Sequence, residues 1–347
     1  MVIYFSPYFY FFLVSGIEAL TRRPLRSACW LGAGALIVFT GLRSDVDNDF
    51  SSYVYYFDQL PPLSDGFGNF FEAATDIYLE PFFSFLISTL KSVVADKWLF
   101  ICIAAISISI YAFVFTTETR TPASAFLIYV ADGFYLREFT QVRFGLAVAL
   151  CALGFYYYRT GHTRRFTTCV VLGGLLHYAT FFALILPPWL RVASKTSRLL
   201  WVSTGLLFAS TTGAFDQVTQ WFANSSFAPV RIAFYAGTSD AESVSAIFIL
   251  IQYLILLALL TVQTKDERYN FYVKVFALSF AILCIFSSFD LLRRISFVFA
   301  TSLYVLFALN VSARRVVPIA LILVLSITLL VMRLNILQPY AAISLIN

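Results

Sequence analysis

The segment SACWLGAGALIVFTGLRSDVDNDFSSY, residues 27–53, changes from apolar to strongly polar within a few positions. Its first part, about 27–42, carries no charge and approaches the roughly 20 residues that a membrane-crossing helix needs. Its second part places Arg43, Asp45, Asp47 and Asp49 close together in a chain that is only 12% charged. We interpret 27–42 as a membrane helix and the polar run as one wall of a site at the membrane surface.

The whole chain repeats this apolar pattern. Its 347 residues are 60% hydrophobic with a mean hydropathy of +0.81, well above the roughly 45–50% apolar content of soluble domains. The apolar runs are too long for the alternating strands of an outer-membrane barrel. The sequence therefore predicts an all-α, polytopic integral membrane protein with about 11–12 transmembrane helices in a single transmembrane domain, 1–347. The first helix follows Met1 without a basic region or cleavage site, so we expect it to be retained.

The expected helices lie at about 2–20, 27–42, 81–95, 98–115, 122–136, 144–158, 166–190, 199–214, 244–262, 271–289, 295–311 and 316–332. The connectors 21–26, 159–165, 265–274 and 313–315 are basic, which predicts that they face the cytoplasm. The two long connectors, about 43–80 and 215–243, then face outward as outer loops.

Two conflicts in this topology predict broken or re-entrant helices. Five apolar segments lie between 21–26 and 159–165, an odd number for two connectors on one side, so either 81–95 or 122–136 should not cross. In addition, Arg191, Lys195 and Arg198 look cytoplasmic, although only the segment 166–190 separates them from Arg165. That segment contains His177 and two prolines, and a break within a membrane is tolerated where the backbone lines a cavity or is covered by protein.

Composition and motifs exclude several functions. The formal net charge of +5 comes from short scattered connectors, as the positive-inside rule expects, so we predict no nucleic-acid binding. The five cysteines are isolated in apolar runs, which favours small hydrophobes over a disulfide frame or metal site. The two histidines are far apart and do not form a zinc pattern. The chain also lacks the nucleophile-elbow, Walker A and dinucleotide motifs, so we expect no metal and no cofactor.

Charged residues at the expected outer ends of the helices are the candidate site. The run that contains Arg43, Asp45, Asp47 and Asp49 would place a carboxylate base beside an arginine that binds an anionic group, although a solvated acidic loop would look the same. Glu80, before Pro81, would be a second carboxylate at the same cavity, or would simply lie at the positive end of a helix dipole. His177 would act on substrate, or would be a satisfied core histidine.

Two basic clusters fall on the predicted outer side, against the positive-inside tendency. The first is the run Arg137–Arg143, and the second comprises Asp290, Arg293 and Arg294. Arginine suits phosphate because its planar guanidinium donates in a fixed fork. An anionic ligand would explain both clusters, and pairing with neighbouring acids is the alternative.

The order of these residues resembles the EpsG family of bacterial polysaccharide polymerases, which includes Wzy-type O-antigen polymerases. That family shows an arginine, a Gly-x-Asp-Tyr and a later tyrosine in its first large outer loop. Arg43, Asp49, Phe50 and Tyr53 take these places here, with Asp47 at the glycine and Phe50 at the first tyrosine. The resemblance extends from about 38 to 300 through Glu80-Pro81, Arg143-Phe144-Gly145-Leu146-Ala147, Leu176-His177-Tyr178 and Arg294-Ile295-Ser296.

The resemblance implies a GT-C-like architecture and a metal-independent glycosyltransferase that joins undecaprenyl-diphosphate-linked oligosaccharide repeats at the periplasmic face of the bacterial inner membrane. Its partners would be that lipid-linked substrate, membrane lipid and a chain-length regulator. On this hypothesis Asp49, Glu80 or His177 is the base. The substrate-binding residues would be Arg43, Asp45, Tyr53, Arg137, Arg143, Asp290, Arg293 and Arg294.

Two other functions fit the same residues. A flippase or carrier for lipid-linked oligosaccharide would use the same arginines without bond chemistry. A membrane O-acyltransferase would depend on His177.

Overall fold

The structure, a computed structural model, describes residues 2–215 apart from 46, 48 and 78, and residues 245–334 together with 337. Within these ranges the regular structure is helical and contains no strand, which confirms the all-α polytopic fold. Most of the predicted outer loop 215–243 lies outside the described residues.

The helices of the first half are α1 (Val2–Thr21), α2 (Arg26–Gly41), α3 (Phe50–Gln59), α4 (Phe67–Asp76), α5 (Pro81–Lys91), α6 (Leu99–Glu118), α7 (Pro122–Tyr129), a π-helix (Val130–Thr140) and α8 (Val142–Arg159). Those of the second half are α9 (Thr163–Leu176), a 3-10 helix (Tyr178–Ile185), α10 (Leu186–Val192), α11 (Thr196–Thr211), α14 (Ala246–Leu260), α15 (Glu267–Ile285), α16 (Asp290–Ala300), α17 (Ser302–Ser312) and α18 (Val316–Leu334).

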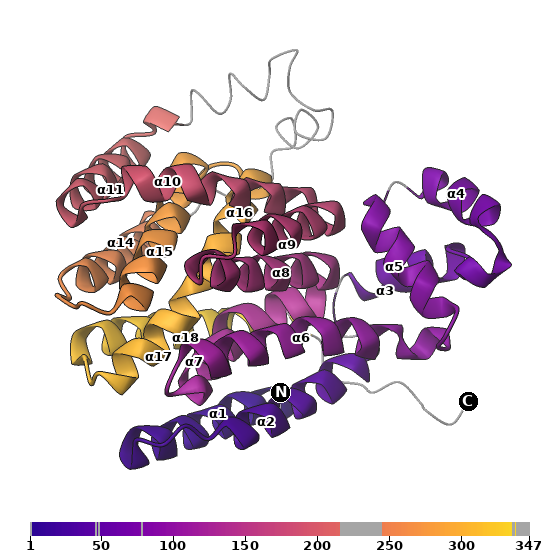
Figure 1. The fold of residues 1–347 in the computed structure, drawn as a ribbon, viewed down its shortest axis with the longest axis horizontal. Coiled ribbons are helices and arrows are strands. Elements are labelled where there is room, and N and C mark those ends of the chain that lie inside the picture. Colours follow the sequence, from indigo (N-terminus) through magenta and orange to yellow (C-terminus); the bar gives the residue numbers. More distant parts are fainter. Residues whose placement is uncertain are drawn as a thin grey trace.

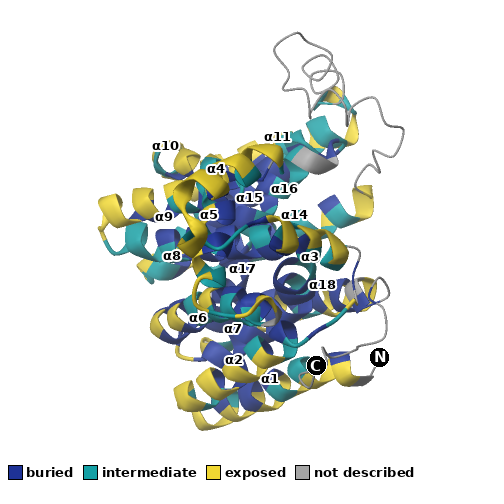
Figure 2. Ribbon diagram, turned by 90° about the vertical axis from the view of Figure 1, so that its right-hand side faces the viewer, coloured by how far each residue is buried: buried dark blue, intermediate teal, exposed yellow. Residues whose placement is uncertain are grey.

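Four of the described helical runs are long and apolar enough to cross a membrane, namely Ile3–Thr21, Leu99–Glu118, Glu267–Ile285 and Leu292–Ser312. The last run joins α16 and α17 across Thr301. Figure 2 shows that α17 is buried inside the bundle, whereas α1 carries exposed residues on its outer side. These include Phe5, Phe9 and Phe12, which suit contact with lipid because lipid tails are as apolar as the side chains.

The basic connectors meet at one end of the bundle, on the left in Figure 1. The Glu118 side chain pairs with Arg159 at the end of α8, and the Glu118 carbonyl accepts a hydrogen bond from Arg268 at the start of α15. The guanidinium of Arg315, between α17 and α18, lies 4.6 Å from the ring centroid of Tyr269. We call this the basic end. Its composition agrees with the prediction that these connectors share one side of the membrane.

The opposite end carries α3, α4 and α5, which gather on the right in Figure 1. The helix α5 has 11 residues, which span about 16 Å and are too short for a hydrocarbon core of about 30 Å. The segment 122–136 is instead extended to residue 140 by the π-helix. These lengths favour 81–95 as the segment that does not cross.

The second conflict is resolved by a break at His177. This residue has φ −159° and ψ 114°, so the backbone is extended between α9 and the following 3-10 helix. A Cβ on Gly173 would lie 3.2 Å from Oγ1 of Thr180, and one on Gly174 would lie within 2.6 Å of the Phe181 ring. The two arms of the segment therefore pack against each other as a hairpin, which returns Arg191 towards the basic end.

Two of the connecting runs are themselves partly helical. The connector 43–80 contains α3 and α4, because its aromatic residues give each a helical apolar face. The run Arg137–Arg143 is not an exposed loop, because the π-helix continues through Arg137 and Glu138 and leaves each only 2% exposed. Buried partners pair with both side chains in part: the outer nitrogens of Arg137 and Oε2 of Glu138 are hydrogen-bonded, whereas Nε of Arg137 and Oε1 of Glu138 have no hydrogen-bond partner among the described residues.

Candidate functional site

Asp49 ends the connector between α2 and α3 at the end of the bundle opposite the basic connectors. It occupies the N-cap position of α3, but its side chain makes no capping hydrogen bond. The helix it precedes is fixed by aromatic contacts, since Phe50 stacks on Phe100 with ring centroids 5.1 Å apart. At the other end of α3, the Lys91 ammonium donates hydrogen bonds to the carbonyls of Phe57 and Leu60. The packing therefore fixes the backbone of Asp49, while its carboxylate makes no capping hydrogen bond to α3.

Arg143 lies in the first turn of α8 and contacts two other elements. Its guanidinium forms an ion pair with Glu80, the residue that precedes α5. Its backbone N–H donates to the hydroxyl of Tyr53 on α3 at 3.3 Å. The Arg143 side chain is 22% exposed and that of Glu80 is 5% exposed, so the pair lies at the edge of the bundle with the arginine on the open side.

Gly145 allows this arrangement because it lets α8 approach the π-helix closely. A Cβ at Gly145 would lie 2.7 Å from the carbonyl oxygen of Arg137 and 2.8 Å from Oε2 of Glu138. Real Cβ contacts are essentially never shorter than 3.0 Å, so only glycine fits here without a backbone shift. The start of α8, and with it Arg143, is thereby placed.

His177 reaches the same region from the turn of the hairpin. Its ring packs on Phe144, the neighbour of Arg143, with centroids 4.8 Å apart. Within the part of the chain that the structure describes, its buried Nδ1 has no hydrogen-bond partner. A buried imidazole nitrogen without a partner is costly in a folded protein, and a catalytic or binding role is one explanation for it.

Arg143 and Arg294 converge electrostatically on Asp49 and His177. Arg294 comes from α16, whose position is fixed by a hydrogen bond from Ser279 of α15 to the Ser296 carbonyl at 2.8 Å. The positive charges of Arg143 and Arg294 both act on Asp49 and both act on His177. Asp49, Arg143, His177 and Arg294 therefore lie close enough for their charges to influence one another, and we refer to these four residues as the cluster.

Burial controls the protonation of the groups at the edge of this cluster. Loss of solvent raises the pKa of Asp49 above its ordinary value, although the charges of Arg294 and Arg143 oppose the rise. Burial also raises the pKa of Tyr53 to about 12, against the charge of Arg143. Tyr53 is therefore a neutral hydroxyl at physiological pH and can donate or accept a hydrogen bond, while Asp49 is a more basic carboxylate than an exposed aspartate.

Arg43 supports this cluster from inside the protein. Its side chain is 0% exposed, and its guanidinium carbon lies 4.4 Å from the ring centroid of Phe100. Its Nε is 3.3 Å from Oδ2 of Asp47, and the other oxygen of that carboxylate accepts the backbone N–H of Asp49 at 2.9 Å. The chain of contacts runs from Arg43 through Asp47 to the backbone of Asp49.

Arg137 is likewise internal. Its guanidinium donates to the Phe297 carbonyl on α16 at 3.2 Å, to Asp132 at 3.4 Å and to the hydroxyl of Tyr304. The Tyr304 hydroxyl in turn donates to Asp132 at 2.7 Å. Arg137 thus ties the π-helix to α16, the helix that carries Arg294.

Three predicted residues remain to be placed: Asp45, Asp290 and Arg293. Asp45 is exposed in the connector, and Arg293 is half-buried on α16. Successive helix residues project roughly 100° apart, so Arg293 and Arg294 point in different directions. Asp290 begins α16, and its side chain lies outside the described part of the chain. Over the described residues, no group of three or more His, Cys, Asp or Glu is placed to hold a metal ion.

Two residues that organise the site, Asp132 and Tyr304, are not among the residues that the sequence singles out. Asp47 belongs to the predicted polar run, but its role as the partner of Arg43 is not predicted there, although a spacing of four residues favours a local ion pair. Asp132 was overlooked inside an apolar segment, where a carboxylate is itself a warning of a buried partner. Tyr304 gave no signal, because tyrosine is common in membrane helices.

The arrangement supplies two guanidinium groups, a basic carboxylate and an imidazole at one edge of a membrane protein. Arginines bind phosphate oxygens, and the carboxylate or imidazole can accept a proton.

Comparison with known proteins adds the family. No curated protein and no solved structure matches the chain. The family model described as "EpsG family" matches residues 29–343, a range that contains every residue of the cluster. The chain therefore belongs to the EpsG family.

Proposed function

We propose that this protein is a polysaccharide polymerase, a membrane glycosyltransferase that joins undecaprenyl-diphosphate-linked oligosaccharide repeats at the periplasmic face of the bacterial cytoplasmic membrane. Membership of the EpsG family is consistent with a polymerase of this kind. The observation that carries the proposal is the convergence of Arg143 and Arg294 on Asp49 and His177. An anion-binding pair beside a proton acceptor is what transfer from a lipid diphosphate requires.

The polarity of the bundle supports the proposed orientation. Arg143 begins α8 and Arg159 ends it, so the cluster and the basic end are separated by about 24 Å along this helix. Basic connectors favour the cytoplasm. The cluster would then face the periplasm, where a lipid-linked repeat that has crossed the membrane is available.

The reaction is a displacement at the anomeric carbon of the growing glycan. A hydroxyl oxygen of the incoming repeat forms a bond to this carbon, and the carbon–oxygen bond to the lipid diphosphate breaks. The bonding electron pair leaves with the diphosphate, and the hydroxyl proton passes to a base on the protein. The demand on the protein is therefore to stabilise negative charge on the diphosphate and to accept one proton.

The contacts suggest a division of these roles. Arg143 and Arg294 would bind the diphosphate, where positive charge stabilises the departing group. Asp49 would accept the proton, since its carboxylate does not cap α3 and burial has raised its pKa. Glu80 is paired with Arg143 and would orient it.

The remaining predicted residues would act around this centre. Tyr53 and His177 would contact substrate beside Arg143. Arg43 and Arg137 would hold the surrounding helices, as their burial suggests.

The test supplies a lipid-linked repeat to purified protein in detergent with a chelator present, and follows chain growth on a gel. Arg143→Ala and Arg294→Ala should each slow chain growth about 100-fold, the usual cost of removing one charge-stabilising donor. Arg164→Ala is the matched control, because Arg164 is exposed in the first turn of α9 at the basic end. Folding is checked by gel filtration and melting temperature.

The outcome separates the candidate functions. A product ladder requires bond formation, so a flippase gives none in detergent. If both arginine variants were folded and made long chains as fast as the parent, the assigned diphosphate site would be wrong.

A further inference from the structure

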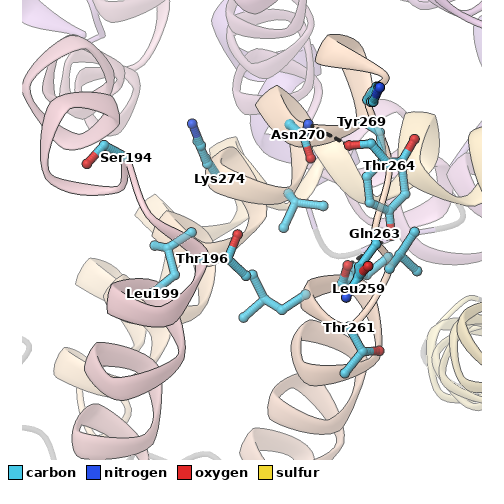
Figure 3. A pocket seen from close by; sticks show the side chains of 14 residues that line it. Ser194, Thr196, Leu199, Leu259, Thr261, Gln263, Thr264, Tyr269, Asn270 and Lys274 are labelled. Carbon is cyan, nitrogen blue, oxygen red and sulfur yellow. Dashed lines mark hydrogen bonds between the residues drawn. The ribbon is translucent and has the colours of Figure 1, made fainter.

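A second site lies at the basic end, away from the cluster. A cavity of about 880 Å³ opens between the connector from α10 to α11 and the connector from α14 to α15. Figure 3 shows Ser194 on one side of it and Asn270 on the other, with Lys274 between them. Thr196 also lines the cavity. The polymerase chemistry proposed above uses none of these residues.

The cavity has a positively charged mouth. Lys265 and Lys274 both line it, and no acidic residue is found among its described lining residues. Asp266, the acid next in sequence to Lys265, pairs with Arg268 at 3.0 Å instead. Lys274 is half-buried, and within the described ranges neither lysine has a carboxylate partner within 4.0 Å. A half-buried cation at a membrane surface calls for an anion.

The walls of the cavity are held by hydrogen bonds. The Asn270 side chain donates to the Thr264 carbonyl at 3.2 Å, and the Tyr269 hydroxyl donates to the Leu259 carbonyl at 3.1 Å. The indole N–H of Trp189 donates to the Lys274 carbonyl at 2.8 Å and fixes α10 against α15. The cavity is therefore preformed, and a ligand would not have to order it.

A second cavity lies further along two of the helices that border the first one. The helices α11 and α14 run antiparallel, since Leu199 and Leu259 line the cavity while Thr204 bonds Tyr253 at 2.8 Å further along. Beyond that contact, a second cavity of about 410 Å³ lies between the same two helices and is lined by apolar residues such as Phe208 and Leu250. Phe208 is 71% exposed.

We propose that this cavity binds an anionic phospholipid of the bilayer, with its phosphate between Lys265 and Lys274 and an acyl chain along the groove between α11 and α14. The occupant must combine a negative head with an apolar tail, because the mouth is basic and the groove is apolar. Basic pockets between transmembrane helices on the cytoplasmic side are suited to anionic head groups. The hydroxyl and amide groups of Thr196 and Asn270 lie where the polar linker of such a lipid would pass.

The test is native mass spectrometry of the full-length protein in detergent with added phosphatidylglycerol or phosphatidylcholine. The unaltered protein should retain the anionic lipid about tenfold better than the neutral one. The double variant Lys265→Gln/Lys274→Gln should lose this preference. The control Arg23→Gln/Arg164→Gln removes the same charge from exposed residues at the same end and should keep it. Equal retention by parent and lysine variant would overturn the proposal.

A second measurement does not depend on the variants folding. Phosphatidylglycerol with a photoreactive acyl chain should label the unaltered protein on α11 or α14, and labelling confined to other helices would refute the site. Inorganic phosphate distinguishes a lipid from a free anion, because millimolar phosphate should not displace a ligand that also has an acyl chain. Full displacement by phosphate would identify a phosphate site and contradict lipid binding.

Discussion

Arg143 and Glu80 form an ion pair that joins the first turn of α8 to the residue preceding α5. These two residues are 63 positions apart in the chain. Their helices are not consecutive, because α6, α7 and the π-helix lie between α5 and α8. Because Glu80 is almost buried and Arg143 is partly open, the pair fixes the arginine from behind and leaves its outer side available. The position of the Arg143 guanidinium therefore depends on the Glu80 carboxylate, whether or not Glu80 itself touches the substrate.

Glu80→Gln tests this orienting role. The amide keeps the shape of the side chain but removes the charge that holds Arg143, so we expect chain growth to fall about tenfold or more, mainly through a higher KM for the lipid-linked donor. Initial rates against donor concentration measure the effect. Glu72→Gln, an exposed glutamate on α4, is the control. A fall in kcat with no change in KM would instead support Glu80 as the base.

Asp49→Asn separates catalysis from stability. The raised pKa of Asp49 means that the folded protein binds its proton more readily than the unfolded chain does. Stability from this group therefore falls as pH rises from the unfolded pKa through the folded pKa. At neutral pH the variant should be at least as stable as the parent, yet it should make no long chains. The melting temperature and the product ladder are measured on the same sample.

The parent should also show an acid limb in its rate profile at a higher pH than an ordinary aspartate would give, because Asp49 must be ionised to accept a proton. Rates from pH 4 to 8 would show this limb. An unchanged limb in folded Asp49→Glu, or full activity of Asp49→Asn, would contradict the assignment of Asp49.

His177→Phe asks whether the imidazole acts chemically. Phenylalanine keeps an aromatic ring against Phe144, and it removes the Nδ1 atom for which the described structure holds no partner. We expect a normal melting temperature with at least a tenfold loss of chain growth. If the ring serves packing alone, His177→Phe should be as active as the parent.

Gly145→Ala should disturb the site without changing any charged group. The added methyl group would meet the Arg137 carbonyl at 2.7 Å, and overpacking of this kind costs about 1–3 kcal/mol. We expect a lower melting temperature and slower chain growth, because α8 must move away with Arg143. Gly154→Ala is the control on the same helix, since its nearest contact would be 3.3 Å from a side-chain atom. Equal effects at both glycines would argue against the close approach.

Arg43→Met tests the buried support. Removing the guanidinium leaves the Asp47 carboxylate buried without its partner, which should lower the free energy of unfolding by about 3 kcal/mol or more. Adding Asp47→Asn should recover part of the loss, because the uncompensated charge disappears while the amide oxygen can still accept the Asp49 N–H. Thermal unfolding of the single and double variants gives the coupling. Strictly additive losses would show that Arg43 and Asp47 do not act as a pair.

The sequence by itself determined the class of fold and the family. Apolar runs require helices, because a lipid environment offers no partner to an open backbone, and the order of Arg43, Glu80, Arg143, His177 and Arg294 was enough to identify the EpsG resemblance. The parity of the basic connectors also predicted a segment that does not cross and a break somewhere within 166–190. The structure assigned these to α5 and to the hairpin after α9.

Only the tertiary structure decided which arginines lie inside and which lie at the edge. Arg43, Arg137 and Arg143 look equivalent in sequence, since each is a cation beside an apolar segment. The first two are enclosed by aromatic rings and buried acceptors, whereas Arg143 is held at the margin by Glu80. That difference arises from contacts between residues far apart in the chain, and local spacing cannot specify how distant helices will meet.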